Sequence, residues 1–261
     1  MIRAVLGPFY CKGKESIPTR LFLMVPLTSA ILNHVIKIET AKGKGTAFFM
    51  RYERQNFLVT AKHLACATQP GDNILCLTFE NDVYSEAVDI EHGTDETDIS
   101  VIKLGNPFYP WEMSSPIVPE TGQLLLGQEV VIAGFPLGLE PRHETLFGNK
   151  PMPLIKGGIF SGMLERSFEG AASRTKHPQY FLDVHNNKGF SGGPVFATSK
   201  NRNTRTTDVH VVAMVSEYFY DRPLGGEATT SNLKPNSGFT VAIPIGKAVE
   251  AVKTLLTKSC P

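Results

Sequence analysis

Apolar and polar residues alternate in short runs along the first half of the chain, and this period of two is typical of strands with one buried face. Glycine-containing stretches such as residues 42–45 separate the runs, as turns between neighbouring strands do. The pattern predicts strands at residues 35–40, 46–50, 57–61, 73–79, 83–90 and 99–104. Such a meander of short strands favours a β-barrel or a sandwich.

The second half continues with short strands after a stretch of different composition. Residues 105–119 are rich in proline and aromatic residues, and we expect them to connect the two halves. Near the end the period changes, because Val249, Val252, Leu255 and Leu256 have helical spacing. We therefore expect a terminal helix over residues 246–258, preceded by strands at 128–135, 155–165, 181–184, around 195, 210–218 and 238–243.

These patterns predict an all-β protein whose 261 residues form one folding unit with a C-terminal helix. Residues 1–34 are expected to be an N-terminal extension that packs on the first half of the fold and contains a short helical turn. Residues 35–116 would form that first half, and residues 117–261 the second half and the terminal helix. Two long loops, 142–153 and 167–178, are candidates for lids or substrate contacts.

The charge balance argues against a nucleic-acid or membrane partner. The chain has 26 basic and 25 acidic residues and a net charge of +1, so it exerts no general pull on polyanions. An apolar run at residues 21–32 contains Pro26 and is too short to span a bilayer. It also begins too late for a simple signal peptide. We expect a soluble, cytoplasmic protein, and the residues give no oligomeric state.

The four cysteines are Cys11, Cys66, Cys76 and Cys260, and they do not have the spacing of metal ligands. This favours free thiols in a reducing compartment, although a bridge between Cys66 and Cys76 stays open at this point. We expect neither a metal nor a cofactor.

The stretch from Gly189 to Phe196 holds a serine, Ser191, between glycines and is followed by a short apolar run. Glycine adopts positive φ angles at little cost and lets another backbone approach closely. A tight turn of this kind can direct two backbone N–H groups at one point beside the serine hydroxyl, as an oxyanion hole requires. Ser161 and Ser216 lack this setting.

A nucleophilic serine needs a base, and the base needs a group that orients it. His63 follows the apolar run at residues 57–61, so a strand would end close to the imidazole. Asp98 directly precedes the alternating residues 99–104 and is the candidate that orients His63. Asp95 is its rival, but Asp98 borders the strand and is the better candidate for a buried carboxylate.

The blocks around His63, Asp98 and Ser191, in this order, resemble the three signature blocks of the trypsin-like, chymotrypsin-fold serine peptidases. The resemblance runs from about Val35 to Leu256 and is strongest to HtrA-type and bacterial trypsin-like peptidase domains. It implies two packed antiparallel β-barrels and a catalytic triad. It also implies an oxyanion hole formed by the N–H groups of Gly189 and Ser191, with a peptide or protein as substrate.

The same resemblance places the walls of the primary specificity pocket at residues 183–188, 215–218 and 237–240. The implied substrate-binding residues are His185, Ser216, Glu217, Tyr218 and Gly238. His185 falls near the pocket floor, and Tyr218 would narrow the mouth, which suits small or aliphatic residues before the scissile bond. Two alternatives stay open. In one, Glu217 attracts a basic side chain of the substrate; in the other, His185 is a packed residue with no contact to substrate.

Phe190 departs from the family pattern. Digestive-type enzymes have Asp before the serine, which pairs with a new N-terminal amine after cleavage, and HtrA-type enzymes have Asn. Activation by such a cut is therefore not expected, and packing or a partner would have to order the oxyanion loop. The chain also leaves no room for a PDZ domain after the barrel, so we expect regulation through loops, oligomerisation or another protein.

An active serine endopeptidase is the reading that we prefer. A catalytically silent or latent peptidase-like module that binds protein is the alternative, and a distorted oxyanion loop at Phe190 would favour it. An esterase is disfavoured, because Ser191 does not lie in the Gly-x-Ser-x-Gly elbow of α/β-hydrolases. Substrates in either case would be peptides or proteins, with one dedicated partner protein as an option.

Overall fold

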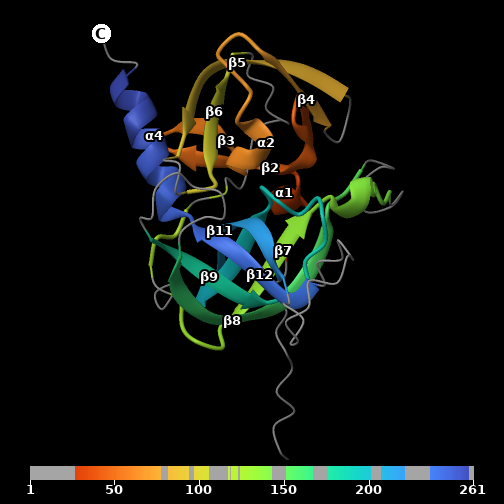
Figure 1. Ribbon diagram of the computed structural model, residues 1–261, viewed down its shortest axis with the longest axis vertical. Coiled ribbons are helices and arrows are strands. Elements are labelled where there is room, and N and C mark those ends of the chain that lie inside the picture. Colours follow the sequence, from red (N-terminus) through yellow and green to blue (C-terminus); the bar gives the residue numbers. More distant parts are fainter. Residues whose placement is uncertain are drawn as a thin grey trace, which may run out of the picture.

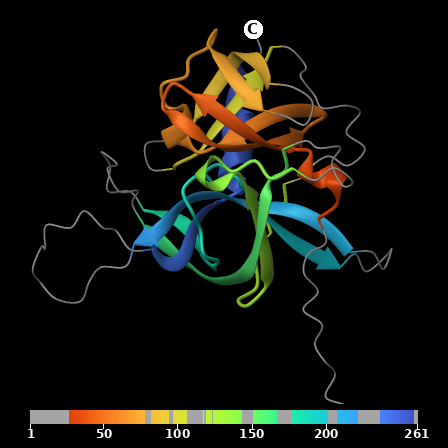
Figure 2. The same cartoon turned by 90° about the vertical axis from the view of Figure 1, so that its right-hand side faces the viewer.

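The protein is built from two closed antiparallel β-barrels stacked on one another (Figures 1 and 2). The structure, a computed structural model, describes residues 27–77, 82–93, 97–105, 117, 119–122, 124–142, 151–166, 176–200, 207–220 and 236–258. The first barrel has the strand order β1-β2-β3-β6-β5-β4, and the second has the order β10-β11-β12-β9-β8-β7.

The first barrel follows a short helix, α1, and is interrupted by a second one, α2. Its elements are α1 (Ser29–Leu32), β1 (Val35–Thr40), β2 (Gly43–Tyr52), β3 (Gln55–Thr60), α2 (Lys62–Ala65), β4 (Asn73–Leu77), β5 (Asp82–His92) and β6 (Ser100–Leu104). Ile36, Ile38 and Leu58 are completely or almost completely buried inside it. The apolar residues of the alternating pattern thus face the interior of the closed barrel and fill it.

The second barrel has longer strands, and a helix follows it. Its elements are β7 (Glu129–Gly134), the 3₁₀ turn η1 (Pro136–Gly138), β8 (Leu154–Arg166), β9 (His177–Asp183), β10 (Pro194–Lys200), β11 (Thr207–Tyr220), β12 (Asn236–Pro244) and α4 (Gly246–Lys258). Ile132, Leu182 and Val195 are among the residues that fill its interior.

A third hydrophobic cluster lies between the barrels and joins them. It contains Phe48 and Phe57 from the first barrel and Phe196 and Met214 from the second. Helix α4 leaves the second barrel after β12 and packs against β5 and β6 of the first (Figure 1). Its buried face includes Ala248, Val252 and Leu255, and Lys258 bonds Glu91 of β5 at 2.6 Å.

The expected fold is confirmed: the chain is all-β, with two antiparallel barrels and a C-terminal helix. Strand β9 begins earlier than expected, at His177, so that Pro178 lies inside the strand; we had interpreted residues 167–178 as a loop. A proline is tolerated near the start of a strand, where the lost N–H costs little. The proposed domain boundaries are not tested and remain predictions.

Of the two expectations for the cysteines, free thiols or a bridge between Cys66 and Cys76, the structure has the free thiols. Cys66 and Cys76 are both free, the first exposed and the second buried, so the bridge between them is not formed. Burial raises the pKa of Cys76 to about 12. Cys11 and Cys260 lie outside the described residues. No helix in the described part of the chain has the length and apolarity needed to cross a membrane.

Candidate active site

His63 is the second residue of α2, the single helical turn that follows β3. The preceding Ala61 is fully buried, and Leu64 is nearly so, which anchors the turn on the first barrel. The His63 side chain itself is 41% exposed. The strand and helix therefore hold the histidine firmly by its backbone and present its imidazole at the surface of the barrel.

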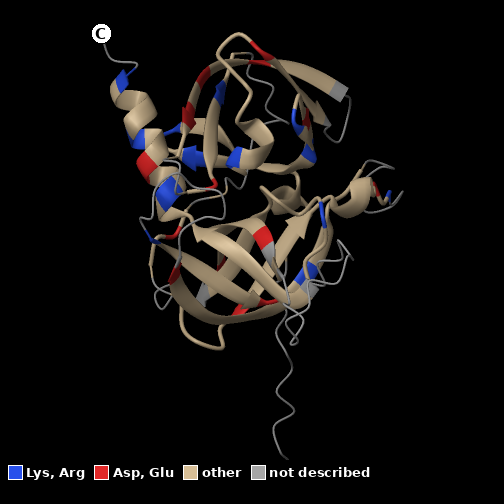
Figure 3. Ribbon diagram, viewed as in Figure 1, with Lys and Arg blue, Asp and Glu red and all other residues tan. Residues whose placement is uncertain are grey.

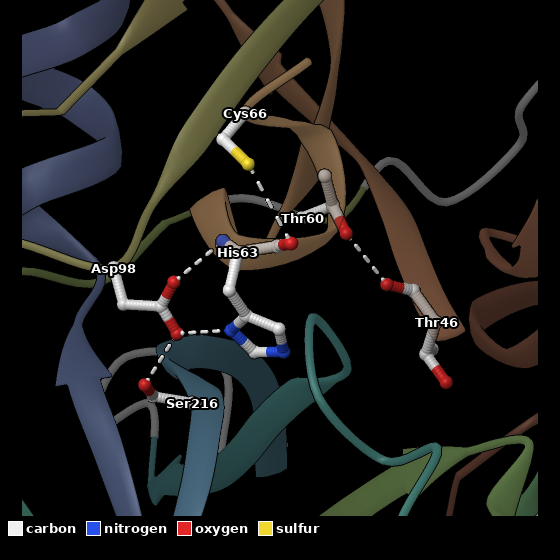
Figure 4. A network of polar contacts seen from close by, with 6 residues as sticks. All are labelled: Thr46, Thr60, His63, Cys66, Asp98 and Ser216. Atoms are coloured by element: carbon white, nitrogen blue, oxygen red, sulfur yellow. Dashed lines mark hydrogen bonds and ion pairs between the residues drawn. The ribbon is translucent and has the colours of Figure 1, made fainter. Parts of the chain in front are cut away.

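Asp98 holds the histidine at two points. Its Oδ1 accepts the backbone N–H of His63 at 2.9 Å, and its Oδ2 lies 2.8 Å from His63 Nδ1 (Figure 4). The carboxylate is only 1% exposed. With Nδ1 bonded to the carboxylate, the neutral tautomer keeps its lone pair on Nε2, the nitrogen that a general base needs.

Ser216, from β11 of the second barrel, adds a third hydrogen bond to this carboxylate. Its hydroxyl donates to Asp98 Oδ2 at 2.6 Å, and the residue is 1% exposed (Figure 4). We had placed Ser216 among the substrate-binding residues, but its side chain points to Asp98. A buried carboxylate is costly unless such donors compensate it, so Ser216 supplies one of the hydrogen bonds that Asp98 needs in its buried position.

The surroundings of His63 favour its protonated form. Burial lowers its pKa, but the hydrogen bond and negative charge of Asp98, together with the charge of Glu217, outweigh burial and leave the pKa above the usual 6.5. The imidazolium that forms during proton transfer would thus be stabilised by two carboxylates.

The serine loop has the close backbone contacts that its glycines suggested. Gly192 has a φ of 83°, and a Cβ there would lie 2.0 Å from the Thr46 carbonyl oxygen. Its N–H donates to Val215 O at 2.8 Å, and the Gly193 N–H donates to Phe190 O at 2.8 Å. These bonds fold the chain into a tight turn with Ser191 at its first central position.

A second turn directly precedes the serine and fixes the direction of the Gly189 N–H. The Phe190 N–H closes it on Asn187 O at 3.2 Å, and Gly189 has a φ of 108°, as the third position of a type II turn requires. The Lys188 carbonyl accepts the Leu137 N–H at 2.7 Å. Because a trans peptide directs its C=O and N–H to opposite sides, the Gly189 N–H faces away from Leu137.

Gly189 and Ser191 keep their backbone N–H groups available for an oxyanion. Within the described part of the chain, neither N–H donates to a protein acceptor. A Cβ on Gly189 would lie 2.5 Å from Phe135 O, so only glycine fits this turn. These two N–H groups are thus able to donate to an oxyanion, and their role as an oxyanion hole stays a prediction.

Phe190 anchors this loop by packing. The residue is fully buried in the interior of the second barrel, beside Ile132 and Val195. The Lys156 ammonium lies 5.4 Å from the centre of its ring, a cation–π contact. An apolar side chain thus occupies the position where digestive-type enzymes have an aspartate.

Lys156 also bonds the turn that leads to Gly189. Its Nζ donates to His185 O at 2.8 Å and to Asn187 Oδ1 at 2.5 Å. Burial lowers the Lys156 pKa. The lysine therefore fixes both the first residue of the turn and the ring of Phe190, without any cleaved N-terminus.

Thr46, from β2, ties the serine loop to the first barrel and was missed by the sequence analysis. Its hydroxyl donates to Gly189 O at 2.7 Å and accepts the Phe135 N–H at 3.0 Å. Its own N–H donates to Ser191 O at 3.0 Å, and its carbonyl accepts the Thr60 hydroxyl at 2.8 Å (Figure 4). The residue is fully buried.

His63 and Ser191 line the same cleft, which has a volume of about 540 Å³. The two side chains are not hydrogen-bonded to each other, and such catalytic bonds are often long before substrate binds. The other residues that line the cleft are Lys42, Gly43, Lys44, Leu64, Phe135, Leu137, Gly138, Lys188 and Gly189. In the described residues no group of three His, Cys, Asp or Glu side chains could hold a metal.

The specificity pocket is less completely described. His185 is exposed, with its carbonyl bonded to Lys156, and Glu217 is near enough to His63 to raise its pKa. Gly238 has a φ of 88°, which favours glycine at this bend of β12. The Tyr218 backbone pairs with Thr240, but its side chain lies outside the described residues. Asp95, the rival of Asp98, also lies outside them.

Solved structures of proteases have the same fold. The Rv3671c protease of M. tuberculosis in its active form is 16% identical to this chain and superposes on it with a TM-score of 0.57. The match covers 97% of this chain and 94% of the Rv3671c chain. The HtrA-type protease AlgW, solved with a tripeptide, is 18% identical with a TM-score of 0.58. It covers 87% of this chain, which spans 61% of the AlgW chain. A search of curated proteins gave no significant match.

The family itself is shown by the sequence. The profile of the trypsin-like peptidase domain matches residues 45–202, which is more than half of the chain and includes His63, Asp98 and Ser191. The chain therefore belongs to the trypsin-like peptidase family.

Proposed function

We propose that the protein is a serine endopeptidase that hydrolyses peptide bonds through Ser191, His63 and Asp98. The observation that carries the proposal is the pair of contacts from Asp98 to His63, at 2.9 and 2.8 Å, beside a cleft that His63 shares with Ser191. The chain's membership of the trypsin-like peptidase family supports the same reaction class.

In the acylation step, Ser191 Oγ attacks the carbonyl carbon of the scissile bond while its proton passes to His63 Nε2. The negative charge that develops on the carbonyl oxygen is accepted by the N–H groups of Gly189 and Ser191. The C–N bond then breaks, and His63 Nε2 gives its proton to the leaving amine. An ester between the substrate acyl group and Ser191 remains.

Water completes the reaction by the reverse sequence. His63 Nε2 takes a proton from the water as its oxygen attacks the ester carbonyl, and the proton returns to Ser191 Oγ as the ester bond breaks. Asp98 keeps the imidazole in position and stabilises its charged form throughout. Each oxyanion donor of such a site is worth about 3 to 4 kcal/mol in the transition state.

The proposal is tested by labelling with a fluorophosphonate, which reacts only with an activated serine. We expect the wild type to be modified at Ser191, as read by mass spectrometry, and Ser191→Ala and His63→Ala to be unmodified. Ser161→Ala, on β8, is the matched serine control and should label as the wild type does. Release of peptides from denatured casein by the same variants gives the second readout.

A folded wild type that neither labels nor releases peptides would overturn the proposal and favour a silent binding module. Circular dichroism and thermal unfolding of each variant show whether a lost signal reflects a lost fold.

A further inference from the structure

The cleft that contains His63 and Ser191 extends from the serine toward the turn between β1 and β2 of the first barrel. The walls implied for the primary specificity pocket come from the segment before the serine and from β11 and β12. No residue of β11 or β12 lines this cleft, which shares Lys188 with the implied wall before the serine and whose opposite wall comes from the turn between β1 and β2. A peptide whose acyl half lies along β11 would therefore direct its leaving half into the cleft.

The charged residues that line the cleft, apart from His63, are all lysines. Lys42 lies in the turn before β2, and Lys44 lies at the start of β2. The third is Lys188, next to Gly189. Among the residues that the structure describes, no Asp or Glu lines the cleft. Lys44 is paired with Glu39 at 2.8 Å, whereas the ammonium groups of Lys42 and Lys188 bond no acceptor in the described residues.

This positive charge is local. Over the whole chain the net charge is +1, and Figure 3 shows basic and acidic residues spread over both barrels. Glu140, whose charge also acts on Lys44, is paired with Lys37 at 2.5 Å. Glu217 contributes negative charge near His63, as its effect on the His63 pKa shows.

The cleft also has apolar groups next to the reacting atoms. Leu64, Phe135 and Leu137 line it together with Ser191, and Leu137 is 68% exposed. An aliphatic side chain directly after the scissile bond would find apolar contacts there, while side chains further along reach the lysines.

We propose that the leaving-group side of this site selects acidic peptides, with Asp or Glu in the residues that follow the scissile bond. The inference rests on the proposed endopeptidase function and names its substrate class. Lys42 and Lys188 provide the recognition, and Lys44 contributes less because Glu39 neutralises it.

The expected preference is moderate, because exposed ion pairs in water are weak and are screened by salt. Replacing Glu by Gln after the scissile bond should lower kcat/KM by about two- to fivefold at low ionic strength. The difference should shrink at 0.5 M NaCl. A preference that survives high salt would point to shape recognition and would contradict the charge argument.

A randomised peptide library, digested and read by mass spectrometry, tests the inference. We expect Asp and Glu to be enriched at the second and third positions after the cleaved bond. The enrichment should disappear in the double variant Lys42→Met/Lys188→Met and persist in Lys253→Met/Lys258→Met, a control on α4 that also removes two exposed lysines. The same library is also panned against Ser191→Ala, so that charge preference is read without turnover.

The outcomes separate the two proposals. Labelling at Ser191 with no acidic enrichment in digestion or panning overturns the inference and leaves the endopeptidase function intact. Absence of labelling and of cleavage overturns the function, and the inference fails with it. Acidic enrichment that the double variant retains assigns recognition to other residues and also overturns the inference.

Discussion

Ser216 donates a hydrogen bond of 2.6 Å to Asp98, and this bond crosses from the second barrel to the first. It connects residues 118 positions apart, and both side chains are buried. The carboxylate that orients His63 is therefore itself oriented by the other barrel.

Ser216→Ala should slow labelling of Ser191 by about tenfold, because a hydrogen bond to a charged group is worth about 1.5 to 3 kcal/mol. The fluorophosphonate rate constant measures the effect, and thermal unfolding shows that the variant is folded. Ser216→Thr keeps the hydroxyl and should recover part of the rate. Equal rates in Ser216→Ala and wild type would mean that Asp98 does not depend on this bond.

The pH dependence of labelling follows from the His63 pKa, which is above its usual 6.5. The base must be neutral, so the rate should rise with pH and reach half its maximum above pH 6.5. Glu217→Gln removes a negative charge that stabilises the imidazolium, so the midpoint should move to lower pH. A wild-type midpoint below 6.5, or an upward shift in Glu217→Gln, would contradict this account.

Thr46→Val should uncouple the serine loop from the first barrel. The change keeps the shape of the side chain but leaves Gly189 O and the Phe135 N–H without their partner. Each buried group left unsatisfied costs about 1 to 3 kcal/mol, so the midpoint of urea unfolding should fall. Thr46→Ser keeps both bonds and should lose much less. Unfolding curves of the two variants, compared with the wild type, test the prediction.

Lys156→Met should weaken catalysis more than stability. The lysine holds the turn at His185 and Asn187 and contacts the ring of Phe190. Without it we expect kcat to fall by about tenfold with little change in KM, because the oxyanion acts only in the transition state. Lys156→Arg, which preserves charge and donors, should recover part of kcat. A loss confined to KM would assign Lys156 to substrate binding instead.

Gly189→Ala should abolish labelling, because a Cβ there would lie 2.5 Å from Phe135 O and the φ of 108° disfavours any other residue. Gly157→Ala, in β8, is the matched control, since a Cβ at that site has no heavy atom within 4 Å. It should label at the wild-type rate. Normal labelling of Gly189→Ala would show that the loop adopts another conformation during the reaction.

The sequence predicted the strands and the terminal helix well, because apolar and polar residues alternate within each strand and apolar residues have helical spacing over 246–258. The sequence also singled out His63, Asp98 and Ser191 as candidates, since each lies in a distinctive local stretch. The predicted start of β9 was wrong, because residues 177 and 178 were assigned to a loop and pairing with β8 extends the strand over them.

Thr46 and Ser216 could not be predicted in these roles, because nothing in their local sequence distinguishes them from other strand residues. Their partners lie 143 and 118 positions away, across the contact between the barrels. The relative position of two barrels depends on packing among Phe48, Phe196 and their neighbours, which no periodicity encodes. The role of Lys156 could not be predicted for the same reason, because this residue of β8 contacts a loop that lies before Ser191 in the sequence.

Helix α4 gives the site a further dependence on the C-terminal part of the chain. It belongs by sequence to the second barrel but is packed on the first, and it shares the cluster that joins them. It therefore connects the two barrels from the C-terminal end of the described chain. We expect limited proteolysis that removes α4 to loosen the contact between the barrels and to lower labelling of Ser191, although α4 contains none of His63, Asp98 and Ser191.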